Sequence, residues 1–93
     1  MSNNDTVSIL KSLADDTRMS IVRRLARDEC EVAGSEIVQT CAEFLKLAQP
    51  TMSHHFARLV QSGVLRERKV GTEKIYQLDK DLLSSVGIDV TKL

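Results

Sequence analysis

The side chains between residues 49 and 61 could hydrogen-bond to a polar partner. Seven of them carry amide, hydroxyl, imidazole or guanidinium groups, and five of these are candidates for DNA contact: Gln49, Thr51, Ser53, His54 and Arg58. Such groups bind the edges of DNA bases and phosphate oxygens. The segment contains no acidic residue, whereas an ordinary solvated helix of this length usually has some. The pattern therefore indicates a DNA-reading surface, with His54 at a base or phosphate and His55 at its flank.

A helix over residues 49–63 would bring these groups together. Pro50 suits the first turn, where its missing N–H has no intrahelical partner to lose, and Gly63 ends the helix because glycine readily takes a positive φ. Four apolar residues recur at helical spacing and predict one buried stripe: Met52, Phe56, Leu59 and Val60. At about 100° per residue, His54 and Arg58 lie opposite this stripe and should be exposed.

A basic hairpin is expected directly after this helix. Residues 65–70 and 74–78 read as two strands joined by a turn at Gly71 and Thr72. The residues expected to anchor it in the core are Leu65, Tyr76 and Leu78. Four cations remain to face solvent or phosphate: Arg66, Arg68, Lys69 and Lys74. A charged hairpin is often only a solvated edge protected from pairing, but its place beside the polar helix favours contact with the DNA backbone or minor groove.

The charge distribution supports the same location. The chain has 13 basic and 13 acidic side chains, which argues against nucleic-acid binding by bulk charge alone. Residues 1–48 carry six basic and eight acidic side chains, residues 49–76 five and two, and residues 77–93 two and three. The basic excess of three therefore coincides with the polar helix and the hairpin. We expect DNA affinity to fall as salt concentration rises.

Three helices are expected before the polar helix. The first has an apolar stripe, with Asp5 or Thr6 as its cap: Val7, Leu10, Leu13 and Ala14. Asp15 and Asp16 begin the second, whose core face comprises Met19, Ile21, Val22, Leu25 and Ala26. After a turn over residues 28–34, Ser35 is expected to cap the third, which contains Ile37, Val38 and Cys41.

The arginines of the second helix have two readings. They are Arg18, Arg23, Arg24 and Arg27. An ordinary exposed face is favoured over phosphate contact, and Arg18 is expected to pair locally with Asp15.

Three stretches of sequence resemble the ArsR-type winged-helix repressors of bacteria. Residues 13–19 read LADDTRM, close to the family's LADPTRL; residues 49–56 read QPTMSHHF, close to SQPTVSHHL; and Ser62-Gly63-Val64-Leu65 precedes a wing at Gly71. The resemblance covers roughly residues 7 to 80. It implies a mainly α fold with a small β-hairpin, a winged helix-turn-helix forming one domain over residues 1–93, and a homodimer.

The resemblance also implies where two copies meet. The terminal segments, residues 5–14 and 79–92, would form the dimer interface, the second of them containing a short helix. The residues expected there are Val7, Leu10, Leu13, Leu82, Leu83 and Val86. Dimerisation fits the physics of a 93-residue chain with three aromatics, because so small a core is marginal alone.

This chain departs from the family pattern at two places. The family joins its third and reading helices by a short turn containing glycine, whereas residues 41–48 contain none, so a longer connection is expected, and Ala48 stands where a Ser cap is usual. Many relatives bind metal through a Cys-x-Cys pair, but this chain has Cys30-Glu31-Val32 at that place and no histidine after His55. No metal site and no cofactor are expected.

Cys30 and Cys41 leave one sensing mechanism open. They could form a thiol redox switch, although Glu29 and Glu31 beside Cys30 disfavour a thiolate, and small apolar filler is the simpler reading. No inducer is indicated.

The expected function is a cytoplasmic, non-enzymatic repressor. No signal peptide or spanning apolar run appears, and no phosphate loop, activated nucleophile or paired carboxylates can be assembled. The partners expected are a second copy and a pseudo-palindromic double-stranded operator. The alternatives are a winged-helix protein-interaction module that has lost DNA affinity and a thiol-based redox-sensing repressor.

Overall fold

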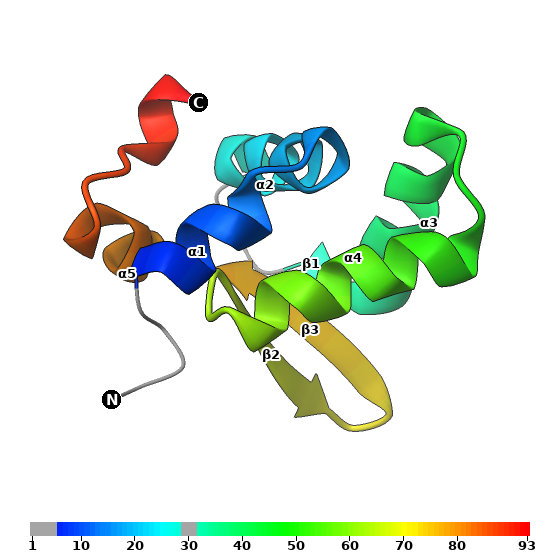
Figure 1. Cartoon of the computed structure of the whole chain (residues 1–93). Helices are drawn as coiled ribbons and strands as arrows, with labels where there is room; N and C mark the ends of the chain where they lie inside the picture. Colours follow the sequence, from blue (N-terminus) through cyan, green and yellow to red (C-terminus); the bar gives the residue numbers. More distant parts are fainter. Residues whose placement is uncertain (1–5, 29–31) are drawn as a thin grey trace.

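The computed structural model describes residues 6–28 and 32–93. Five α-helices lie within these ranges: α1 Thr6–Leu13, α2 Asp16–Asp28, α3 Gly34–Leu45, α4 Gln49–Gln61 and α5 Lys80–Ser85. The strands are β1 Val32–Ala33, β2 Leu65–Val70 and β3 Glu73–Leu78, and a 3-10 helix, η1, spans Val90–Lys92. Figure 1 shows the β2–β3 hairpin projecting next to α4.

The polar helix and the hairpin have the predicted bounds to within two residues. Gly63 has φ of 88° and follows the end of α4, and Gly71 has φ of 66° in the turn between β2 and β3. Both positions use a backbone conformation that glycine adopts without steric cost. The sheet has the order β1-β3-β2, and the hairpin register pairs Leu65 with Leu78 and Lys69 with Lys74.

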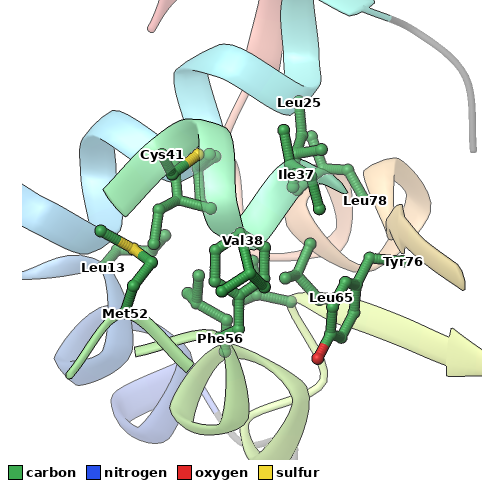
Figure 2. Packing of buried hydrophobic residues seen from close by; sticks show 14 of the residues in the cluster. Leu13, Leu25, Ile37, Val38, Cys41, Met52, Phe56, Leu65, Tyr76 and Leu78 are labelled. Carbon is green, nitrogen blue, oxygen red and sulfur yellow. The ribbon is translucent and has the colours of Figure 1, made fainter. Parts of the chain in front are cut away.

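One stripe of α4 supplies the centre of the core, as predicted. Met52, Phe56 and Leu59 are buried. The ring of Phe56 lies 5.0 Å from that of Tyr76, and Figure 2 shows Phe56 next to Val38 of α3. Burial of these side chains holds α4 against α3 and β3, so the polar face of α4 is left outside.

The predicted core residues of the second and third helices face the core, with Met19 and Ala26 only partly buried, but α3 begins differently. Ala33, whose side chain cannot hydrogen-bond, takes the N-cap position with extended dihedrals. The expected cap, Ser35, instead donates its hydroxyl to Glu73 Oε1 at 3.0 Å. The predicted turn over residues 28–34 contains β1, in which Ala33 pairs with Ile75. The pairing of Ala33 with Ile75 determines where α3 begins, and no signal in the neighbouring residues predicts this pairing.

Gly34 permits the close approach of α3 to β3. A Cβ placed at this residue would lie 2.9 Å from the carbonyl oxygen of Lys74 and 3.1 Å from the ring of Tyr76. Glycine is needed here for space rather than for backbone conformation.

The expectation of a longer connection between α3 and α4 is wrong. α3 continues to Leu45, and three residues reach the start of α4 at Gln49. Lys46 takes the left-handed conformation, with φ of 58°, that a glycine usually supplies at a helix C-terminus. The connection is short because the residues beyond Cys41 continue the helix.

The terminal segments differ in part from prediction. α1 buries Ile9 and Leu13 along one i, i+4 row, whereas Val7 and Leu10 are 61% and 49% exposed. Leu13 and Leu83, also expected at the dimer interface, lie in the core of the protomer itself. Leu82 and Val86 pack at the edge of that core and are partly buried. The proposed cap Asp5 lies outside the described residues.

Within residues 6–28 and 32–93, no helix has the length and hydrophobicity that crossing a membrane would require.

Candidate nucleic-acid interface

The outer face of α4 presents the predicted reading residues together. Gln49, Thr51, Ser53, His54 and Arg58 are all exposed. Ala48 at the N-cap offers no side-chain hydrogen bond, so the first N–H groups of α4 are available to an external acceptor. This face can donate to phosphates from its N-terminal turn and can contact base edges with its side chains.

The two adjacent histidines have different surroundings. His54 is exposed, whereas His55 is partly buried and its Nδ1 accepts a hydrogen bond from Arg18 Nη1 at 3.2 Å. Because arginine can only donate, this contact requires an unprotonated Nδ1. Burial lowers the pKa of His55, and Arg18 adds to this, although Asp15 Oδ2 at 3.9 Å opposes it. His55 is therefore a support residue of the interface, as predicted for a flanking position.

Arg18 links the start of α2 to both α1 and α4. Its Nε donates to the carbonyl oxygen of Ser12 at 2.6 Å, and its backbone N–H donates to Asp15 Oδ2 at 2.9 Å. The second bond caps α2 and is the main reason that the pKa of Asp15 is lowered. Arg18 thus does more than pair with Asp15, because it fixes the orientation of α4.

A buried hydroxyl pair also joins α1 to α4. Ser62 Oγ donates to Ser12 Oγ at 2.9 Å, and Ser12 Oγ donates to the carbonyl oxygen of Ile9 at 2.8 Å. Sequence reasoning missed this contact, because Ser62 stands out only as part of the Ser62-Gly63-Val64-Leu65 stretch, Ser12 lies in no pattern, and the two are fifty positions apart. Their one sequence signal is a serine near the C-terminus of each helix.

The hairpin carries its four cations on the surface, as expected. Arg66, Arg68, Lys69 and Lys74 are exposed. Arg66 Nε lies 3.5 Å from Asp79 Oδ2, and Lys74 Nζ lies 3.6 Å from Glu67 Oε2. Such surface pairs are worth only about 0–1 kcal/mol, so a phosphate can replace the carboxylate at small cost. Lys69 and Lys74 are direct cross-strand partners, and an anion beside them would relieve their repulsion.

The structure describes the surroundings of only one of the two cysteines, Cys41. Cys41 is 5% exposed and packs in the core on α3 (Figure 2), whereas Cys30 lies outside the described residues. Over residues 6–28 and 32–93, no group of three or more His, Cys, Asp or Glu side chains is placed to hold a metal ion.

Comparisons with known proteins agree with this geometry. A family model described as a helix-turn-helix domain matches residues 13–68. An uncharacterised HTH-type transcriptional regulator of Methanocaldococcus jannaschii is 35% identical over 78 residues, which cover 84% of this chain and 82% of that protein. The arsenical resistance operon repressor of Staphylococcus xylosus is 31% identical over 87 residues, covering 94% and 78% respectively.

Solved structures show the same fold. A crystal structure of an ArsR family transcriptional regulator, RHA00566, matches with a TM-score of 0.68 and 28% identity, covering 86% of this chain and 76% of that one. The homodimeric winged helix-turn-helix DNA-binding domain Mb0332 from Mycobacterium bovis matches with a TM-score of 0.66 and 25% identity, covering 86% and 69%. The acid-free face of α4, the basic hairpin beside it and these matches show that the chain belongs to the ArsR-type winged helix-turn-helix transcriptional regulators.

Proposed function

We propose that this chain is a transcriptional repressor that binds a pseudo-palindromic operator as a homodimer, with residues 1–93 forming one DNA-binding domain. The observation that carries the proposal is the exposed, acid-free face of α4, held by a buried stripe next to a hairpin with four cations. Repression follows from occupying a promoter. The name of the Staphylococcus relative, an operon repressor, supports the same sign of regulation.

Each part of the interface has a separate role in the proposal. Gln49, Thr51, Ser53 and His54 contact base edges in the major groove, and Arg58 contacts a base or a phosphate. The hairpin cations contact the backbone or the minor groove. Because two identical copies are related by a twofold axis, their α4 helices enter successive major grooves about 34 Å apart.

The proposed dimer interface uses the apolar residues that remain at the surface. Val7 and Leu10 on α1 are the exposed members, and Leu82 and Val86 are the partly buried ones. A homodimeric relative supports this mode of assembly. Leu13 and Leu83 pack in the core of each protomer and hold α1 and α5 in place for this contact.

The test begins with selection of genomic fragments by the purified protein. An inverted repeat bound by two chains is the expected result, and affinity should fall steeply with salt because the basic excess is local. The double variant Thr51→Ala with His54→Ala should weaken binding to that repeat by about 2–4 kcal/mol, since each good base contact is worth about 1–3 kcal/mol.

The matched control is Gln39→Ala, which removes an exposed amide on α3, outside α4, the hairpin and the terminal segments, and should leave affinity unchanged. If the double variant binds as tightly as this control, the assigned reading face is wrong. Failure to enrich any sequence would instead favour a protein-interaction module.

A further inference from the structure

A hollow of about 630 Å³ opens between α1, α2 and α4, at the end of α4 remote from its N-terminus. Its lining includes one cation from each of the three helices: Lys11 from α1, Arg18 from α2 and Arg58 from α4. Hydroxyl and amide groups of Ser12, Ser62 and Gln61 form much of the wall. Ser8 and Val7 complete the lining, and Val7 also belongs to the proposed dimer interface. None of the described residues that line it is acidic.

This arrangement of charge is unfavourable without an anion. Three cations around one hollow repel one another, and none of the described residues at its wall supplies a carboxylate, although Asp15 next to Arg18 offsets part of that residue's charge. The carbonyl ends of α1 and α4 offset part of this charge. An oxyanion would offset the rest and would accept hydrogen bonds from guanidinium, ammonium and hydroxyl groups.

The guanidinium of Arg18 is already held in position. Nε donates to the carbonyl oxygen of Ser12 and Nη1 donates to His55 Nδ1, while Ser62 and Ser12 hydrogen-bond to each other beneath the hollow. A donor fixed in this way loses little conformational entropy when a ligand binds. The planar fork of arginine also suits tetrahedral oxyanions better than a point charge does.

We propose that this hollow binds a phosphate-class oxyanion. Two sources share the chemistry: a backbone phosphate of bound DNA, reached through Arg58 on the outer face of α4, or a free phosphate group on a small molecule. Binding of the oxyanion is inferred from the residues that line the hollow and does not depend on DNA binding. Its effect on operator affinity rests on the proposed function, because the ligand would contact the helix that reads DNA.

The first experiment uses the full chain without DNA, so its outcome is independent of operator binding. Inorganic phosphate is titrated at constant ionic strength, with chloride as the reference, and the amide shifts of Ser12, Arg18 and Ser62 are followed by NMR. A saturable shift at these residues is expected. Lys11→Gln should weaken phosphate binding about tenfold, because it removes one charge-assisted hydrogen bond to the oxyanion.

The matched control is Lys92→Gln, which removes one exposed cation from η1, outside the hollow. It should bind phosphate as the unmodified chain does. Equal binding by Lys11→Gln and Lys92→Gln would overturn the proposal, because the attraction would then be bulk charge. Absence of a saturable shift would overturn it as well.

The second experiment distinguishes the two sources by adding the selected operator. If the site binds a phosphate of the DNA backbone, adding the operator displaces inorganic phosphate from the hollow. In that case Lys11→Gln also weakens operator binding when no inorganic phosphate is added. If the site takes a free ligand, phosphate and operator bind together, and phosphate changes operator affinity in the unmodified chain but not in Lys11→Gln. Either result supports the oxyanion site.

Discussion

At the scale of single residues, neighbouring side chains of one type have different tasks. His54 and His55 point about 100° apart on α4, so one faces outward and the other meets α2. Burial lowers the pKa of His55 and the Arg18 guanidinium adds to this, against the opposing effect of Asp15, because burial of a charged imidazole is unfavourable and the guanidinium repels it. An exposed histidine and a partly buried, hydrogen-bonded one thus occupy adjacent positions.

The lowered pKa of His55 predicts a pH-dependent stability. The unfolded chain binds a proton near the ordinary value of 6.5, whereas the folded chain binds it only at lower pH. The contribution of neutral His55 to the free energy of unfolding is therefore complete above pH 6.5. It is lost as the pH falls through the lowered pKa of the folded chain. Urea unfolding from about pH 7.5 to about pH 5 should show a decreasing free energy of unfolding.

The variant His55→Gln should flatten this dependence, because glutamine can still accept a hydrogen bond but does not ionise in this range. His54→Gln removes the exposed imidazole of the same helix and serves as the control. An equal slope in His55→Gln and in the unmodified chain would contradict the assignment.

At the scale of elements, the connection between α3 and α4 depends on one unusual backbone angle. Lys46 adopts a left-handed conformation that brings its side chain close to its own carbonyl oxygen. We expect Lys46→Gly to raise the free energy of unfolding by about 1 kcal/mol, less the entropy that glycine gains in the unfolded chain. Thermal or urea unfolding measures this change.

Lys46→Ala is the matched control, because it removes the charge but keeps the strained backbone. It should leave stability nearly unchanged. If Lys46→Gly is less stable than Lys46→Ala, the left-handed turn is not the source of strain.

The contact between α3 and β3 predicts a second effect at this scale. Gly34→Ala would place a methyl group against the backbone carbonyl of Lys74, which cannot rotate away. Repositioning α3 should cost about 1–3 kcal/mol of stability, as overpacked sites do. Ser35→Ala at the next residue removes only an exposed hydrogen bond to Glu73 and should cost less than about 1 kcal/mol. Equal losses would show that the space at residue 34 is not limiting.

At the scale of the whole molecule, the small core leaves apolar surface on α1. Leu10 is half exposed on the side of α1 that does not face the core. In the proposed dimer, Leu10→Glu would put a charge into the contact of each copy and should weaken association by at least about 2 kcal/mol. Sedimentation equilibrium would show monomers at concentrations where the unmodified chain is dimeric.

The control for this variant is Phe44→Glu. Phe44 is 73% exposed on α3, so the substitution changes surface hydrophobicity and charge equally without touching α1. It should leave the dimer intact. If both variants dissociate alike, the interface does not lie at α1.

Much of the fold and of the candidate site could be predicted because the signals are local. The apolar stripe of α4, the glycines at both of its following turns and the alternation in the hairpin are properties of consecutive residues. They determine which side chains face outward, so the exposure of the polar face of α4 and of the hairpin cations could be predicted directly. The N-cap of α3 was less predictable. Ser35 is a residue type that often caps helices, but Ala33 pairs with Ile75 in the sheet and α3 begins directly after it, at Gly34.

The sequence by itself determined the helix α4 with its exposed polar face, the hairpin after it and their basic excess, because periodicity and charge are properties of neighbouring residues. Only the tertiary structure decided which residues of α1 are buried, how the chain passes from α3 to α4, and that Ser12, Arg18, His55 and Ser62 meet. Those outcomes depend on the angles at which helices pack. The contacts that result join residues up to fifty positions apart, and no pattern of neighbouring residues predicts contacts over that separation.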